Sequence, residues 1–408
     1  MTMVATDLDA QVESARDDRL RILIAGAGVA GITLAALLRR QGLHPVVIER
    51  MPAMSHPGYM LALMPTVDRV FDDLGIRREY LADSTPLSRY AFHSRRGRRL
   101  RTDDLGALLA VHGDYQGVER GILLDLLSSD GTPVSFGASI GAITWDDGES
   151  AVSFADTGVT ASFDLVVAAE GIHSRTRDLL PVGNVHATDT GWGGWVSWCP
   201  PIGDEELGEE VWGDGSFLGV YPVKGRLGVF LGGPVADTVV GPRAFADRVR
   251  AAAPELSARL LAALDAVAAD PDPYFWPLTD VRAERWVAPG AVLLGDAAAG
   301  FLPTAGIGAA MAMESAWMLG RMLAHADRDG LSQVLAEWER IEKPRVEAAQ
   351  SNSRMLARLM FRRGRAVAWL RETVMRMLTV KAALGPIIGL IAKQPDPDAA
   401  AHRVLNGR

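Results

Sequence analysis

The sequence predicts an α/β protein in which a β-rich domain is inserted into a domain built from βαβ units and is followed by C-terminal helices. An apolar strand, a glycine-rich turn and a helical pattern follow one another over residues 21–42. Alternating segments rich in tryptophan and glycine occupy residues 188–240, and the chain after Gly330 is arginine-rich with helical periodicity. At 408 residues, the chain is also longer than one compact core normally requires.

The composition is that of an ordinary globular protein and excludes several classes of function. Hydrophobic residues make up 48% of the chain and charged residues 23%, which excludes a disordered chain. The net charge of −8 excludes nucleic acid as a partner, because nonspecific affinity comes from Lys and Arg neutralising phosphates. Cys199 is the only cysteine, which excludes an internal disulfide and fits a reducing cytoplasm. The eight histidines form no zinc-binding motif, and we expect no metal.

Neither end of the chain carries a signal for export or membrane insertion. Residues 1–20 are polar and acidic without an apolar segment, and we expect a disordered, solvated tail there. The uncharged stretch 382–392 is much shorter than the ~20 apolar residues that span a bilayer. We therefore expect a cytoplasmic protein with no transmembrane segment. Residues 382–392 are expected to form a helix packed on the body, with contact to a membrane surface as the alternative.

The N-terminal βαβ unit carries a dinucleotide-binding pattern. The turn after the first strand reads Gly26-Ala-Gly28-Val-Ala-Gly31, and the second strand ends at Glu49. The glycines let the backbone approach a pyrophosphate at the N-terminus of the helix. Glu49 lies close to the ~20-residue offset expected of an acid that binds ribose hydroxyls. The unit therefore predicts a Rossmann-like dinucleotide site, with Arg50 directly after the acid.

Two later segments have the same strand, turn and helix character. Residues 164–169 form a buried-strand pattern that leaves through Glu170 into a turn and a helix. Residues 291–294 form another, which closes on Asp296 before a loop containing Pro303, Gly306 and Gly308. Glycine-rich loops that open a helix present bare backbone N–H groups to an electron-rich ligand. Both segments are therefore candidates for contact with the same dinucleotide.

These motifs, in this order, resemble those of the group A flavoprotein monooxygenases, the single-component FAD hydroxylases with the p-hydroxybenzoate hydroxylase fold. The resemblance covers nearly the whole chain. It implies an FAD-binding Rossmann-like domain with an inserted antiparallel β-sheet substrate domain. We expect the FAD-binding domain at residues 21–83, 104–183 and 286–330, the substrate domain at 84–103 and 184–285, and a C-terminal helical segment at 331–408.

The resemblance also assigns FAD-binding residues. Asp296 corresponds to the aspartate that binds the FAD ribityl chain, and Arg120 to an arginine used near the flavin. The expected set is Gly26, Gly28, Gly31, Glu49, Arg50, Arg120, Glu170, Asp296, Pro303, Gly306 and Gly308. The chain departs from the family at Glu170, where aspartate is usual. It departs again at Ala299, Ile307 and Ala310, where His, Gln and Asn are common, which bears on the positioning of the flavin.

In the family, NADPH or NADH reduces FAD and O₂ then forms a flavin C4a-hydroperoxide, which must be kept dry while it passes oxygen to the substrate. The resemblance therefore implies an FAD-dependent monooxygenase that hydroxylates or epoxidises a small, largely apolar or aromatic molecule, such as a secondary metabolite. The inserted domain is the candidate for the dry pocket. Its candidate wall residues are Trp192, Trp195, Trp198, Phe217, Tyr221 and Phe230. We assign no catalytic base, since one sequence does not place the walls of the pocket.

Other interpretations stay open. A flavoprotein reductase or desaturase of an isoprenoid-like substrate shares the first and third motifs, and a non-catalytic FAD-binding protein would also keep them. A flavin-dependent halogenase is disfavoured, because the chain has no lysine before Lys224. The arginines at residues 95–101 are expected to be a solvated hairpin tip, with the phosphates of NADPH as the alternative partner.

Overall fold

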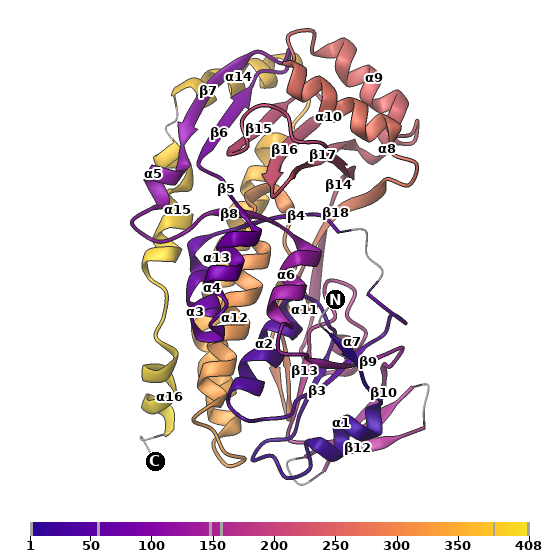
Figure 1. The fold of residues 1–408 in the computed structure, drawn as a ribbon, viewed down its shortest axis with the longest axis vertical. Helices are drawn as coiled ribbons and strands as arrows, with labels where there is room; N and C mark the ends of the chain where they lie inside the picture. The colour runs from indigo at the N-terminus through magenta and orange to yellow at the C-terminus, as the bar shows by residue number, and fades with distance from the viewer. Residues whose placement is uncertain (1–2, 55–57, 147–148, 156–157, 378–379, 406–408) are drawn as a thin grey trace.

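The computed structural model describes residues 3–54, 58–146, 149–155, 158–377 and 380–405. It shows two bodies, each built on a large sheet, stacked along the long axis of the molecule (Figure 1). The lower body in this view contains the N-terminal βαβ unit. The upper body contains the tryptophan-rich segment, and the C-terminal helices run along one side of both.

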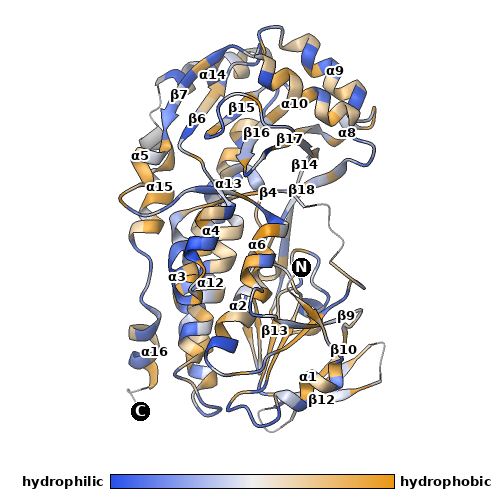
Figure 2. Ribbon diagram, in the orientation of Figure 1, coloured by the Kyte–Doolittle hydropathy of each residue, from blue (hydrophilic) through white to orange (hydrophobic). Residues whose placement is uncertain are grey.

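A seven-stranded sheet in the order β1-β9-β3-β2-β13-β20-β19 forms the centre of the lower body. Neighbouring strands are parallel, except that β19 and β20 are antiparallel. The strands are β1 (Val4–Ala5), β2 (Ile22–Ala25), β3 (Val46–Glu49), β9 (Pro133–Phe136), β13 (Leu165–Ala168), β19 (Val287–Ala288) and β20 (Ala291–Leu293). Every residue of β2, β13 and β20 is buried, as expected of parallel strands covered on both faces, and Figure 2 colours this centre as hydrophobic.

The N-terminal tail is ordered, and the prediction of a disordered tail is wrong for residues 3–20. Here β1 pairs with β9, and α1 (Leu8–Ser14) packs against β3. The buried amide of Gln11 accepts a hydrogen bond from the N–H of Val47 (2.9 Å) and donates one to its carbonyl (3.1 Å). Leu8 and Leu20 are buried as well. A few inward-facing residues anchor a segment whose average composition is polar, which is why composition alone was misleading. Residues 1 and 2 lie outside the described residues.

Helices and small sheets complete the lower body. Its helices are α2 (Val29–Arg40), η1 (Pro65–Val67), α3 (Asp68–Leu74), α4 (Arg77–Asp83), α6 (Arg120–Leu127), α7 (Thr176–Leu179), α11 (Asp296–Ala299), η2 (Pro303–Ala305) and α12 (Gly308–Leu323). Its two small antiparallel sheets comprise β4 (Met60–Leu63), β5 (Thr85–Pro86) and β8 (Gln116–Glu119), and β10 (Ile140–Asp146), β11 (Glu149–Phe154) and β12 (Thr160–Phe163). The two long helices, α2 and α12, pack against each other where a Cβ on Gly320 would lie 3.2 Å from Leu37.

The upper body is a second seven-stranded sheet in the order β18-β14-β17-β16-β15-β6-β7. Its strands are β6 (Arg89–His93), β7 (Arg99–Asp104), β14 (Val185–Cys199), β15 (Leu207–Trp212), β16 (Phe217–Val223), β17 (Arg226–Pro234) and β18 (Tyr274–Ala283). All neighbours are antiparallel except β15 and β6. One face is covered by α8 (Val235–Thr238), α9 (Pro242–Ala252) and α10 (Ala258–Ala269), and the other face is turned toward the lower body (Figure 1).

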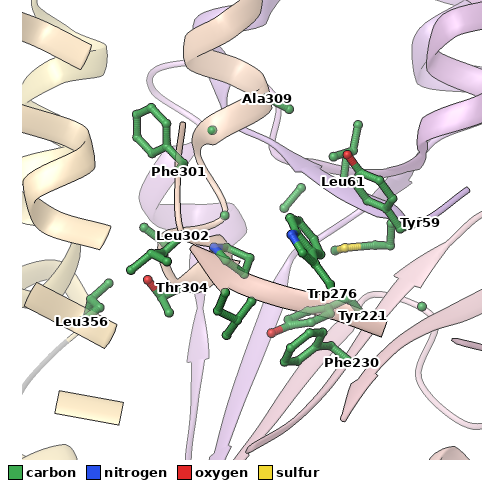
Figure 3. A pocket seen from close by; sticks show the side chains of 18 of the residues that line it. Tyr59, Leu61, Tyr221, Phe230, Trp276, Phe301, Leu302, Thr304, Ala309 and Leu356 are labelled. Atoms are coloured by element: carbon green, nitrogen blue, oxygen red, sulfur yellow. The ribbon is translucent and has the colours of Figure 1, made fainter. Parts of the chain in front are cut away.

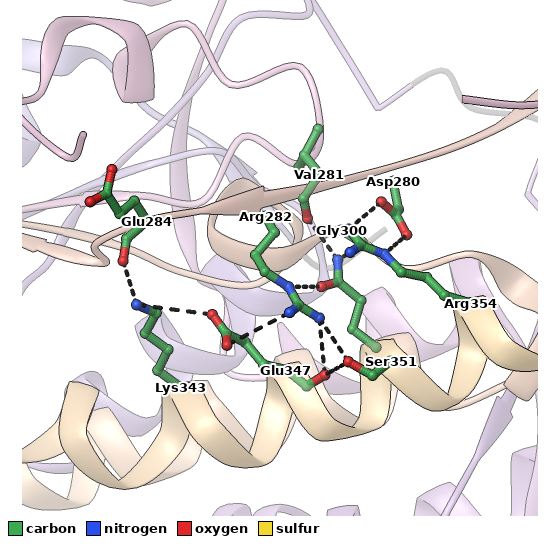
Figure 4. A network of polar contacts seen from close by, with 10 residues as sticks. Asp280, Val281, Arg282, Glu284, Gly300, Lys343, Glu347, Ser351 and Arg354 are labelled. Atoms are coloured by element: carbon green, nitrogen blue, oxygen red, sulfur yellow. Dashed lines mark hydrogen bonds and ion pairs between the residues drawn. The ribbon is translucent and has the colours of Figure 1, made fainter. Parts of the chain in front are cut away.

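The remaining helices are α5 (Leu105–Leu109), α13 (Leu331–Met360), α14 (Arg365–Met377), α15 (Val380–Ala392) and α16 (Pro397–Leu405). Figure 4 shows how α13 is fastened to β18. Arg354 forms two 2.7 Å bonds to the carboxylate of Asp280, and Gln350 donates to the carbonyls of Val281 (2.7 Å) and Gly300 (2.5 Å). These bonds fix the loop after α11 against both bodies. Among the described residues, no helix is both long and apolar enough to cross a membrane.

Candidate functional site

A cavity of about 560 Å³ lies between the two bodies, and its lower end gathers residues from all three predicted FAD motifs. Gly26 follows β2, Glu49 ends β3, Glu170 follows β13 and Asp296 follows β20. These strands are neighbours in the order β3-β2-β13-β20, so their carboxyl ends meet at one edge of the sheet. Ligands of open α/β sheets bind at this edge. Segments up to 270 residues apart in the chain therefore form one end of the cavity.

The three glycines of the first turn differ in what surrounds them. Gly26 has a φ of 110°, and a Cβ there would lie 2.5 Å from the carbonyl oxygen of Ala169. A Cβ on Gly31 would lie 2.0 Å from the carbonyl oxygen of Gly26. By contrast, a Cβ on Gly28 would meet nothing within 4 Å, and Gly28 lines the cavity. Two glycines are thus needed for packing, while the third leaves an open cradle at the N-terminus of α2 that fits a phosphate group.

The two glutamates at this edge have backbone partners. Glu49 accepts hydrogen bonds from the N–H groups of Ala27 (3.1 Å) and Met51 (2.9 Å), which hold its carboxylate beside the glycine turn. Glu170 accepts from the hydroxyl of Ser174 (2.6 Å) and the N–H of Thr176 (2.9 Å). It therefore closes its own turn as well as lining the cavity.

Arg50 and Gly31 do not line the main cavity. Arg50 lies on an adjoining crevice of about 50 Å³, together with Glu49, Glu170 and Arg175. His173 lies on the same crevice as an exposed turn residue.

The third motif presents a carboxylate to the cavity. Asp296 is the first residue of α11 and is exposed to the cavity, where desolvation by the surrounding cavity walls raises its pKa to about 6. Arg177 donates to the carbonyl of Ala297 (3.1 Å) and so ties the second motif to the third. Beyond α11, the cavity is lined by Pro303, Gly306 and Gly308.

The residues that depart from the family in this motif have a common environment. They are buried in the core of the lower body and are absent from the cavity lining: Ala299, Ile307 and Ala310. These departures therefore replace polar groups with core packing.

Arg120 and Tyr59 meet in the middle of the cavity. The N–H of Arg120 donates to the carbonyl of Tyr59 (2.9 Å), and its guanidinium carbon lies 5.8 Å from the centre of the tyrosine ring. Burial raises the pKa of the Tyr59 hydroxyl, and the positive charge of Arg120 opposes this rise. Tyr59 also contacts Trp276, with ring centres 5.3 Å apart, so this pair joins the cofactor end to the aromatic end (Figure 3).

The upper end of the cavity is aromatic, although only half of the predicted wall residues belong to it. Phe217, Tyr221 and Phe230 line the cavity, and Figure 3 shows Tyr221 and Phe230 close together there. The prediction that Trp192, Trp195 and Trp198 line it is wrong. Side chains alternate between the faces of a strand, and a spacing of three residues does not keep them on one face.

The three tryptophans pack against the protein itself. Trp195 lies under α9 in contact with Phe245, Trp192 stacks on Phe361, with ring centres 4.3 Å apart, and Trp198 lies beneath the guanidinium of Arg226.

Other residues of this wall are ones that the sequence analysis did not single out. The aromatic ones are Tyr90, Phe92, Tyr115, Trp212, Trp276, Phe301 and Phe361. The ends of α13 to α15 add aliphatic side chains at Leu356, Leu359, Met360, Val374, Met375, Leu384 and Ile387. The most unusual residue is Glu210 on β15, a buried carboxylate that accepts hydrogen bonds from Tyr90, Trp212 and Tyr221. The sequence signal was a pair of glutamates, Glu209-Glu210, within a strand that is otherwise apolar.

The arginine cluster forms the hairpin between β6 and β7, as expected. Arg95 pairs with Glu372, Arg96 with Glu255, and Arg99 with Glu209. Arg101 pairs with Asp103 and lines the cavity. Four of the five hairpin arginines thus have acidic partners within the protein, and Arg98 is exposed.

Comparison with known proteins agrees with this geometry. A family model described as "FAD binding domain" matches residues 19–353. The aurachin C monooxygenase/isomerase of Stigmatella aurantiaca is 26% identical over 88% of this chain and 94% of its own. The 6-hydroxynicotinate 3-monooxygenase of Bordetella bronchiseptica is 28% identical over 82% of this chain and 90% of its own. Among solved structures, Klebsiella pneumoniae HpxO complexed with FAD and uric acid superposes with a TM-score of 0.82 at 22% identity, over 92% of this chain and 97% of that one.

Proposed function

The chain belongs to the FAD-binding-domain family, among the group A flavoprotein monooxygenases, and is an FAD-dependent oxidoreductase that uses NAD(P)H and O₂; from this premise we propose how the cavity divides between cofactor and substrate. The observation that carries the proposal is the single cavity that runs from the three motifs to the aromatic face of the upper sheet. The lower end takes FAD, and the upper end takes a largely apolar aromatic substrate.

The lower end fits FAD by its chemistry. The open cradle at Gly28 takes the pyrophosphate, Glu49 takes the ribose hydroxyls, and Asp296 accepts from the ribityl chain. Arg120 and the loop at Gly306 border the region between the two ends. When bound, FAD would supply the redox chemistry, because it can be reduced by NAD(P)H and can transfer an oxygen atom from O₂ to the substrate.

The protein's own contribution at the upper end is to exclude water and orient the ring. Phe217 and Phe230, whose ring centres are 5.9 Å apart, form an apolar wall, and Leu359 and Val374 add aliphatic side chains to the lining. Such a pocket protects a reactive oxygen donor from water and holds an aromatic ring by its faces. We propose hydroxylation of an aromatic ring as the reaction. We also propose a reducing cytoplasm as the compartment, because Cys199 is a free, buried thiol.

The visible spectrum of the purified protein, taken anaerobically before and after NADPH, tests the cofactor assignment. We expect a yellow protein that bleaches, and Asp296→Ala should lose FAD. A colourless protein that does not take up added FAD, or an Asp296→Ala variant that stays fully yellow, would contradict the assignment.

Turnover under ¹⁸O₂ tests the reaction. A monooxygenase places one labelled atom in the product, whereas a reductase or desaturase places none and a non-catalytic FAD-binding protein forms no product. Unlabelled product would therefore refute the proposed hydroxylation.

A further inference from the structure

Two adjacent glutamates on β15 lie in opposite electrostatic environments. Glu209 faces away from the cavity and has two cationic partners, Arg259 at 3.2 Å and Arg99 at 3.3 Å, and the ring of His93 lies 3.0 Å from its Oε1. Although burial opposes them, these partners lower the pKa of Glu209. The negative charge of its carboxylate is therefore balanced by groups of the protein, and its burial requires no ligand.

Glu210 faces the cavity, and its three donors are neutral. The hydroxyls of Tyr90 and Tyr221 both donate to Oε1, the latter at 2.7 Å, and the indole N–H of Trp212 donates to Oε2 at 2.7 Å. Burial raises the pKa of Glu210, and these bonds oppose the rise. A carboxylate has about four acceptor sites, so one site on Oε2 is left by these three bonds. Because Glu210 lines the cavity, this remaining site can accept a hydrogen bond from a ligand that carries a donor.

The tyrosines reinforce this acceptor character. Each tyrosine donates its single O–H to Glu210, so the oxygens of Tyr90 and Tyr221 can only accept a further hydrogen bond. Their pKa values are raised well above the ordinary value by burial and by the nearby carboxylate, so they stay neutral. The three side chains come from β6, β15 and β16, which lie side by side in the upper sheet, and all of them line the cavity.

We propose that Glu210, with Tyr90 and Tyr221, is an acceptor site that selects aromatic substrates carrying an O–H or N–H donor and rejects aromatic carboxylates. The inference rests on the proposed function and names the substrate class of the same cavity. A carboxylate ligand at this site would meet acceptors and find no free donor, because the O–H groups of Tyr90 and Tyr221 and the N–H of Trp212 are all directed to Glu210. Arg101 lines the cavity, and its guanidinium donates to Asp103 (2.5 Å) and to the carbonyl of Met375 (2.9 Å).

Three ligands of matched shape test the proposal: 2-naphthol, 2-methoxynaphthalene and 2-naphthoate. Their dissociation constants are measured by titration calorimetry on the full-length, FAD-treated protein. We expect 2-naphthol to bind up to about tenfold more tightly than 2-methoxynaphthalene, because one net hydrogen bond to a buried acceptor is worth up to roughly this factor. We expect 2-naphthoate to bind more weakly than either. This ranking in the unaltered protein does not depend on any variant folding.

Two single substitutions on the same strand separate recognition from structure. Glu210→Gln should bring 2-naphthol and 2-methoxynaphthalene within about threefold of each other. Glu209→Gln should leave the ranking of the three ligands unchanged, although it lowers the stability of the fold by leaving the buried Arg259 without its carboxylate partner. Tightest binding of 2-naphthoate, no binding of 2-naphthol, or an unchanged preference in Glu210→Gln would overturn the proposal. FAD content and NADPH oxidation, measured on the same preparation, report on the proposed function instead.

Discussion

Replacing single glycines in the first turn should separate cofactor binding from packing. We consider Gly28→Ala and Gly31→Ala, which add the same methyl group three residues apart. At Gly28 the methyl group enters the cavity, and at Gly31 it enters the contact between α2 and the turn. The first change should therefore weaken FAD binding in a folded protein, and the second should destabilise the fold.

The magnitude at Gly31 follows from the geometry. Its Cβ would lie 2.0 Å from the carbonyl oxygen of Gly26, and a relaxed C···O contact is about 3.3 Å. Relief would need α2 to move by about 1.3 Å. Both groups are backbone-bound, so no side-chain rotation helps, and α2 is packed against α12 at Leu37 and Gly320. We expect a loss of about 3 kcal/mol in the free energy of unfolding, at the upper end of the range for overpacking.

The magnitude at Gly28 is different because the space around it is open. The backbone there has a φ of −78°, which alanine adopts freely, and no atom lies within 4 Å of the added methyl. The unfolding free energy of the FAD-free protein should change by less than about 1 kcal/mol, the cost of alanine at a helix N-cap. The methyl occupies the cradle of the pyrophosphate, so FAD affinity should fall by about 10- to 100-fold.

The assay is thermal unfolding of the FAD-free proteins together with FAD titration followed by flavin fluorescence. The expected pattern is normal unfolding with weak FAD binding for Gly28→Ala, and early unfolding for Gly31→Ala. Wild-type FAD affinity in Gly28→Ala would refute the assignment of the cradle. An equally stable Gly31→Ala would refute the packing argument.

Three further predictions concern titration and packing. Asp296 is ionised above its pKa of about 6 and then accepts hydrogen bonds from FAD hydroxyls. The affinity for FAD should therefore fall below pH 6, by up to about tenfold per pH unit. In FAD titrations, Asp296→Asn should abolish this pH dependence. Burial and the nearby carboxylate of Glu314 raise the pKa of Glu342 to about 8, so the folded state loses stability as pH rises toward 8. The melting temperature of Glu342→Gln should exceed that of the wild type at pH 9 and equal it at pH 5. Equal melting temperatures at both pH values would contradict this. Arg371 is buried and donates to the carbonyls of Trp212, Gly213 and Met360, so Arg371→Met should cost about 3 kcal/mol in thermal unfolding. The variant should also release more hydrogen peroxide per NADPH, because α14 contributes Val374 and Met375 to the cavity lining.

Local patterns predicted that residues from the three motifs gather at one end of the cavity, for a physical reason. Gly26, Glu49, Glu170 and Asp296 each stand at the carboxyl end of a short apolar strand, and parallel neighbours bring those ends to one edge. The signal is carried by a few consecutive residues, so no long-range contact has to be known. The N-terminal tail shows the limit of the same approach, because the hydrogen bonds of Gln11 to Val47 cannot be recognised from a polar composition.

The sequence by itself determined the order of strands and glycine turns, the family resemblance and the FAD chemistry that follows from it, because each depends on local spacing. The tertiary structure alone decided which aromatic residues face the cavity and which of two adjacent glutamates does so. Strand alternation gives opposite faces to Glu209 and Glu210, but which face is the cavity depends on the helices packed on the other side. The partners of Glu210 lie on different strands, and only folding brings Tyr90 and Tyr221 to the same carboxylate oxygen.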